Sequence, residues 1–213
     1  MAGVVRCGVL AGLIVGAAAI APVFRASRRV ALVGAVASFA GSPTASRAIG
    51  GGSTKDFERS VASAYAAFTK GDYAASEQLW AQITEQFPDA SLGWQNYATV
   101  CIINASDKMK LGELPTGEPL QRLTRALAAL DKAESFGDSD ALLANSRGNA
   151  LGLLQRWEEA HTAYAAAVDL SARDFESIPL SNQALTSFEL GRTDVAEREA
   201  SRLVRRDPKF VDG

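Results

Sequence analysis

The fold is decided by the stretch GDYAASEQLWAQITEQFP at 71–88 and by its counterpart GRTDVAEREASRLVRRDP at 191–208. Both stretches begin with Gly and end with Pro, and the interval between the two residues is 17 in each. Small and bulky apolar residues recur between them every three to four positions, which is the spacing of one helix face. Each stretch therefore predicts a turn, a helix of about four turns and a stop at proline.

A third copy of the pattern lies at 148–167, where Gly148 is followed by Trp157, Ala160, Tyr164 and Ala167. Self-similarity at a fixed period is the mark of a repeat architecture. The helix-forming residues Ala, Leu, Glu, Gln and Arg dominate the sequence from Ser53 onward. We therefore expect an all-α fold of four helix-turn-helix units, which run over 57–90, from 91 to about 140, over 141–174 and over 177–208.

Each recurring position has a physical reason. Gly71 and Gly191 are expected to end a first helix, because a positive φ costs little only for glycine. Pro88 and Pro208 are expected to end a second helix, because proline cannot continue it. Small residues are predicted where the two helices of a unit approach most closely, namely Ala64, Ala98, Gly148 and Ala184. The pairs Trp80/Ile83 and Tyr164/Ala167 each lie on one helix face and are predicted to pack under the next unit.

The second unit is longer than the others by 16 residues, at about 105–120. The extra segment contains Gly112, Pro115, Gly117 and Pro119, so it predicts a surface loop between two helices. The domain organisation expected from the sequence is a leader at 1–48, a linker at 49–56 and a helical domain at 57–213 with this loop insert.

Between the paired Gly and Pro, a small residue is followed four positions later by an aromatic residue. This pattern resembles the 34-residue tetratricopeptide repeat (TPR). The resemblance covers about 150 residues and implies a TPR-like solenoid with a concave surface built from the first helix of each unit. Carrying over the family's groove positions implies Val61, Tyr65 and Phe68 in the first unit, Gln95, Thr99 and Ile102 in the second, Asn145, Asn149 and Gly152 in the third, and Ser181, Leu185 and Phe188 in the fourth.

This implied groove is apolar and lined by amides. Asn145 and Asn149 are one helical turn apart, so both could bond the backbone of an extended peptide; the alternative is two solvated polar residues. The chaperone-binding branch of the family clamps a carboxylate with Lys, Asn and Arg. None of the groove positions here is Lys or Arg, so binding of a chaperone tail is not expected.

Composition excludes several classes of function. With 22 basic and 24 acidic residues the net charge is −2, which gives no support for nucleic-acid binding. Two cysteines and one histidine exclude a zinc finger, and nothing near His161 resembles a hydrolase nucleophile elbow. We expect no catalytic residues, no metal and no cofactor. His161 is expected on an exposed helix face, and Cys101 in the core.

The first 48 residues contain five arginines and no acid, whereas the remainder carries about −7. Arg6 precedes an apolar run at 9–21, and Arg28 and Arg29 precede a second apolar run at 30–40 that ends at Ser46-Arg47-Ala48. This arrangement is typical of targeting sequence, with a twin-arginine-like second signal. The second run is too short to span a bilayer, which takes about 20 apolar residues.

The order of these segments resembles the tripartite leader of thylakoid-lumen proteins in algae with secondary, red-derived plastids. The sequence AAAIAP at 17–22 resembles the first junction of such leaders, with Ile20 in place of an aromatic residue. Together with the repeats, the chain resembles the chloroplast thylakoid-lumen TPR family. The alternatives are a bacterial-type export signal and an uncleaved membrane anchor at 9–24.

The resemblance implies a non-enzymatic protein-protein interaction module, a peripheral subunit or assembly factor of a photosynthetic membrane complex such as a photosystem. The alternative is a periplasmic or membrane-anchored scaffold in envelope complex assembly. A third hypothesis, an enzyme, is disfavoured because the sequence shows no pocket constellation, metal set or phosphate loop; turnover that is lost on mutation of His161 would revive it. The last helix is also expected to leave Leu203 and Val204 without a following repeat to cover them, a face that could meet a partner or a second copy.

Overall fold

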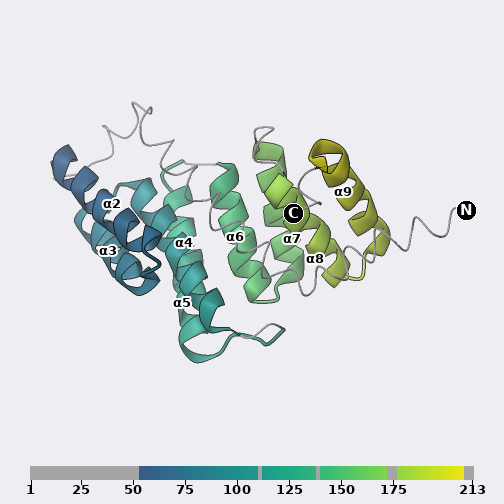
Figure 1. Ribbon diagram of the computed structural model, residues 1–213, viewed down its shortest axis with the longest axis horizontal. Helices are drawn as coiled ribbons and strands as arrows, with labels where there is room; N and C mark the ends of the chain where they lie inside the picture. Colours follow the sequence, from purple (N-terminus) through teal and green to yellow (C-terminus); the bar gives the residue numbers. More distant parts are fainter. Residues whose placement is uncertain (1–52, 110–111, 138–139, 172–176, 209–213) are drawn as a thin grey trace, which may run out of the picture. The chain divides into compact units, whose positions relative to one another are not determined.

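The computed structural model describes residues 53–109, 112–137, 140–171 and 177–208 (Figure 1). Every regular element in these ranges is an α-helix. The helices are α2 (Thr54–Thr69), α3 (Tyr73–Gln86), α4 (Ser91–Lys108), α5 (Gly117–Glu134), α6 (Ala141–Leu153), α7 (Trp157–Leu170), α8 (Ser177–Glu189) and α9 (Thr193–Arg206). The predicted leader lies outside the described residues, and α2 begins inside the predicted linker, at Thr54.

The helices pack on their neighbours in chain order, within two compact units. In the first unit, the described residues of which are 53–137 with the gap at 110–111 and 149–155, α3 packs on α2 and α4, and α5 packs on α4. In the second, with 140–148 and the described part of 156–208, α8 packs on α7 and α9. The predicted fold class, an all-α solenoid-like succession of helical hairpins, is confirmed.

Three hairpins turn through the same backbone conformation. Gly71 and Gly191 have φ of +80° and +71°, as predicted, and each amide donates to the carbonyl three residues earlier at 2.9 Å. Gln155 occupies the third turn at φ +56°, although it is not glycine. After the first turn, the Asp72 side chain caps α3 by accepting from the Ala75 amide at 3.0 Å.

Small residues lie where the two helices of a hairpin meet, as predicted. A methyl group built on Gly148 would lie 2.5 Å from the ring of Tyr164, so the ring occupies the space that any larger residue would need. In the first hairpin, Ala64 is fully buried, and its carbonyl accepts a hydrogen bond from Ser76 Oγ at 3.0 Å. These contacts bring the helix axes close enough to exclude water between them.

The predicted positions Trp80/Ile83 and Tyr164/Ala167 are buried. Trp80 and Ile83 are both 1% exposed, and the ring of Tyr65 packs edge-on against Trp80 with 5.2 Å between centroids. In the second unit Val168, Leu180 and Leu203 form one buried cluster. Burial of side chains of this size contributes about 1.5–3 kcal/mol each before the entropy of ordering is subtracted.

The last helix corrects one prediction. Leu203 was expected to lie uncovered, but it is 7% exposed and packs with Val168 and Leu180; Val204, one residue and about 100° further round the helix, is 43% exposed. The face of α9 opposite Leu203 carries polar and charged side chains, namely Asp194, Glu197, Arg198, Ser201 and Arg205. The face of α9 that points away from the core is therefore polar.

The boundaries predicted for the insert were also wrong. Residues 105–108 continue α4, where Ala105 is fully buried, and residues 117–120 belong to the first turn of α5. Pro119 is accommodated there, because the first amides of a helix need no intrahelical acceptor. The connection between α4 and α5 is therefore 109–116, of which the structure describes residues 109 and 112–116.

Candidate functional site

Several of the predicted groove residues in the first compact unit bond to or pack against other residues of that unit. Tyr65 on α2 is half-buried, and its hydroxyl donates to Asn96 Oδ1 on α4 at 3.0 Å. Asn96 in turn donates from Nδ2 to the Leu92 carbonyl at 2.9 Å. Burial raises the pKa of Tyr65 to about 12, so its hydroxyl stays protonated and keeps donating at neutral pH. This bond sets the first helices of two successive hairpins next to each other.

The other predicted groove positions of this compact unit are either buried or half-buried. Phe68 and Gln95 are each 9% exposed and belong to the packed interior. Thr99 is half-buried and donates back to the Gln95 carbonyl at 3.0 Å, while Asn149, from the end of α6, is also half-buried. Tyr65, Thr99 and Asn149 are therefore the groove positions of this unit that a ligand could reach.

Asn145 was predicted either to bond a peptide backbone or to be solvated, and both predictions are wrong. Asn145 is 3% exposed, and its Oδ1 accepts from Asn182 Nδ2 at 3.3 Å, so it is neither solvated nor available to a peptide. The periodicity of α6 placed it on the right face but could not show that α8 would cover it. Ser181 and Phe188 on α8 are half-buried and remain reachable. The bond from Asn145 to Asn182 repeats, in the second unit, the link between successive first helices that Tyr65 makes in the first unit.

His161 is not exposed, contrary to the prediction. Its side chain is 19% exposed, and Nε2 lies 3.3 Å from Glu199 Oε1 on α9. The other carboxylate oxygen accepts from Ser187 Oγ on α8 at 2.7 Å. In a hydrolase triad the imidazole lies between the carboxylate and the nucleophile. Here the carboxylate lies in the middle and Ser187 is fully buried, so the cluster joins three helices and does not present a nucleophile.

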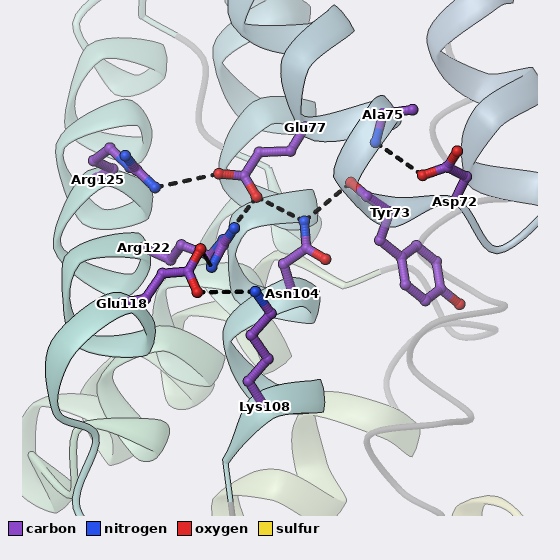
Figure 2. A network of polar contacts seen from close by, with 9 residues as sticks. All are labelled: Asp72, Tyr73, Ala75, Glu77, Asn104, Lys108, Glu118, Arg122 and Arg125. Carbon is purple, nitrogen blue, oxygen red and sulfur yellow. Dashed lines mark hydrogen bonds and ion pairs between the residues drawn. The ribbon is translucent and has the colours of Figure 1, made fainter.

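A second polar network joins α3, α4 and α5 (Figure 2). The sequence did not predict it. Glu77 is 9% exposed, and its Oε2 accepts from Asn104 Nδ2 at 2.6 Å and from Arg122 Nε at 2.8 Å. Its Oε1 accepts from Arg125 at 3.3 Å. Glu118 pairs with Arg122 at 2.6 Å and with Lys108 at 2.9 Å. Local spacing gives no signal for this network, because its members lie between residues 77 and 125 on three different helices.

These ion pairs shift the pKa of two members of the network, Glu118 and Arg122. Hydrogen bonds from Lys108 and Arg122 lower the pKa of Glu118. Arg122 is partly desolvated, which favours its neutral form, but the carboxylates of Glu77 and Glu118 outweigh this and raise its pKa. The guanidinium therefore remains charged. The network fixes the register of the long α4–α5 hairpin and offers no reactive group.

Cys101 was predicted to be a core residue, and it is fully buried. Burial, with the Glu77 carboxylate adding to it, raises the pKa of its thiol from 9.0 to about 12. A thiol that stays protonated is a poor nucleophile and a poor metal ligand. Among the residues that the structure describes, no group of three or more His, Cys, Asp or Glu side chains could hold a metal ion.

The arginine-rich end of the chain forms a shallow surface hollow along α9. Asp194 and Glu197 line it together with Arg198 and Arg205, so the hollow has mixed charge and does not resemble a phosphate site. No helix in the described part of the chain is both long and apolar enough to cross a bilayer.

No protein-family model matches the chain, and no curated protein shows a significant match to it.

Proposed function

We propose that this protein is a non-enzymatic protein-protein interaction module of the TPR class. The proposal is supported by the four helical hairpins, by the Gly-to-Pro interval of 17 that occurs twice, and by the close contact of a small residue with an aromatic residue inside a hairpin. Repeat arrays of this kind use the surface of their first helices to hold an extended partner segment.

One observation carries the proposal. In each unit, a polar side chain of one first helix bonds to a polar side chain of the next first helix, through Tyr65–Asn96 in one unit and Asn145–Asn182 in the other. First helices joined in this way form a continuous surface in each unit. The reachable side chains on it are uncharged, namely Tyr65, Thr99, Asn149, Ser181 and Phe188. An uncharged peptide segment is the ligand that such surfaces would favour.

For the location we propose the thylakoid lumen, with the protein acting as a peripheral subunit or assembly factor of a photosynthetic membrane complex. The support is the acid-free leader with two apolar runs and the Arg28-Arg29 pair before the second run. A periplasmic or membrane-anchored scaffold is the alternative that the same leader allows.

The surface can be tested by blocking it. Thr99→Arg in the first unit and Ser181→Arg in the second place a long cation on a half-buried groove position. Gln82→Arg adds the same charge at an exposed position of α3 and is the matched control. We expect partners isolated with the tagged protein to fall at least tenfold for a groove variant and to be unchanged for the control, with equal helical content by circular dichroism. Equal recovery for all variants would contradict use of the groove.

A further inference from the structure

The outer face of α9, which lines the hollow described above, carries charged side chains that have no ion pair with any described residue. Arg198 and Arg205 also make no hydrogen bond there, whereas every other arginine that the structure describes has an interaction. The same face holds Asp194, Glu197 and Ser201. α9 is the last helix of its unit and packs on α8, so no described helix follows it to pair these charges (Figure 1).

These charges are arranged symmetrically about Ser201. Glu197 lies four residues before Ser201 and Arg205 lies four residues after it. Each of the two is therefore about 6 Å along the helix axis from Ser201 and about 40° round the helix, on opposite sides. If a second copy of α9 ran antiparallel to the first, with Ser201 on the two-fold axis, Glu197 of each copy would face Arg205 of the other.

The same symmetry accounts for an exposed apolar side chain. Arg198 lies three residues before Ser201, and Val204, which is 43% exposed, lies three residues after it. In the antiparallel arrangement the aliphatic part of each Arg198 side chain covers Val204 of the other copy, because long cationic side chains can lie along apolar surface. The small side chain of Ser201 at the centre allows the two helices to approach to the 8–10 Å typical of packed helices.

The charge pattern favours a second copy in this orientation over other occupants. In a parallel pairing in register, Glu197 would meet Glu197 and Arg205 would meet Arg205, and like charges across an interface are unfavourable. A purely acidic or purely basic ligand would match only one half of the face. A contact between identical subunits about a two-fold axis requires one patch that is complementary to itself, and the outer face of α9 meets this requirement.

We propose that the outer face of α9 is the contact surface of a homodimer, in which two copies of α9 pack antiparallel about Ser201. Exposed ion pairs contribute little each, and Val204 is the exposed large hydrophobic residue of α9, so the dimer is weak, transient and sensitive to salt. α9 is the second helix of its hairpin, so the contact leaves the surface of the first helices free. The inference does not depend on the proposed function.

The charge pairing is tested by reversal and by exchange in the purified full chain. Glu197→Arg and Arg205→Glu each set like charges against each other, so we expect the dissociation constant of the dimer, measured by sedimentation equilibrium, to rise at least tenfold. The double variant Glu197→Arg/Arg205→Glu restores unlike pairs and should return to within about threefold of the wild type. Glu85→Arg, the same reversal at an exposed position of α3, is the control and should leave the constant unchanged.

Circular dichroism of each variant checks that its helical content equals that of the wild type. Three results would overturn the proposal: a wild-type chain that is monomeric at every concentration, a dimer that neither single reversal weakens, or a double variant weaker than both single ones. Thr99→Arg, which blocks the first-helix surface, should leave the dimer intact, so failure of this inference and failure of the proposed function are distinguishable.

The position of the two-fold axis is tested with an intermolecular disulfide in a Cys7→Ser background, in which the fully buried Cys101 does not compete. Ser201→Cys places the two new thiols at the axis, where the Cα atoms can reach the roughly 4.4–6.8 Å that a disulfide needs. Asp194→Cys places them about 21 Å apart along the helices and is the control. We expect mild oxidation to link Ser201→Cys chains at least tenfold faster than Asp194→Cys chains. Equal rates would overturn the antiparallel arrangement.

Discussion

At the scale of single residues, Gly148 has no room for a side chain, because the ring of Tyr164 lies 2.5 Å from where a Cβ would be. Alanine favours a helix over glycine by about 1 kcal/mol, but forcing a methyl group into a packed interior costs about 1–3 kcal/mol. Tyr164 is 3% exposed and cannot move aside. We therefore predict that Gly148→Ala lowers the free energy of unfolding by about 1–2 kcal/mol in urea titrations.

Gly93 is the matched control for this prediction. Its nearest neighbour would be a methyl group of Ile83 at 3.1 Å, a contact that a small shift can relieve. Gly93→Ala should leave the stability within about 1 kcal/mol of the wild type, because the gain in helix propensity offsets the tighter contact. Equal effects of the two substitutions would mean that the Gly148–Tyr164 approach is not tight.

Cys101 gives a second prediction at this scale. Its thiol is fully buried with a pKa raised to about 12, so at pH 8 it should not react with a thiol reagent while the protein is folded. The measurement uses the Cys7→Ser variant, in which Cys101 is the remaining cysteine. We expect labelling near zero in buffer and one label per chain in urea. Rapid labelling in buffer would show that the α3–α4–α5 interface opens readily.

At the scale of elements, the Glu77 network determines how α5 sits against α3 and α4. Arg122 has an 11% exposed side chain and Glu77 a 12% exposed one, so removal of the Glu77 charge leaves a largely buried cation. Breaking a buried pair typically costs 3–5 kcal/mol. We predict that Glu77→Gln costs about 3 kcal/mol in the free energy of unfolding, at the low end because Arg122 keeps Glu118 as a partner.

The double variant Glu77→Gln/Arg122→Met provides the control, because it removes both charges and should recover most of the loss. Glu118→Gln acts on the exposed side of the same network and should change the stability little. A Glu77→Gln protein as stable as the wild type would show that the network does not hold α5.

Helix pairing could be predicted from the sequence where glycine and proline mark the ends, and less well elsewhere. Gly71 and Gly191 identified two turns, but the equivalent turn at Gln155 carries no such signal, because its positive φ is compensated by a contact 43 residues away. The predicted insert was too long, because residues 105–108 continue α4 and residues 117–120 begin α5. Contacts between distant elements are not encoded in local spacing.

The same limit applies to the candidate site. The repeat register placed Tyr65, Thr99 and Ser181 on the first-helix surface, where they are half-buried. It could not distinguish them from Asn145, which lies on the same face but is covered by Asn182. The Glu77 network and the His161–Glu199 contact depend on residues far apart in sequence, so periodicity alone could not reveal either of them.

At the scale of the whole molecule, the sequence combines a helical-hairpin domain with an acid-free N-terminal segment. The fold class followed from the apolar spacing and the turn residues, because a succession of short amphipathic helices can bury its faces only against neighbouring hairpins. Function could not be predicted from the fold class, because proteins that share this fold bind many different partners. The proposed interaction function must therefore be tested on the complete protein.

The most direct measurement is affinity isolation of the native protein from detergent-solubilised membranes, with mass spectrometry of its N-terminus and of the proteins that accompany it. The account predicts a mature chain that starts near Ile49, together with stoichiometric subunits of a photosynthetic membrane complex. An intact N-terminal leader with envelope or periplasmic proteins would contradict the lumen proposal. Recovery of the protein alone, at every detergent concentration that preserves membrane complexes, would contradict its role as an interaction module.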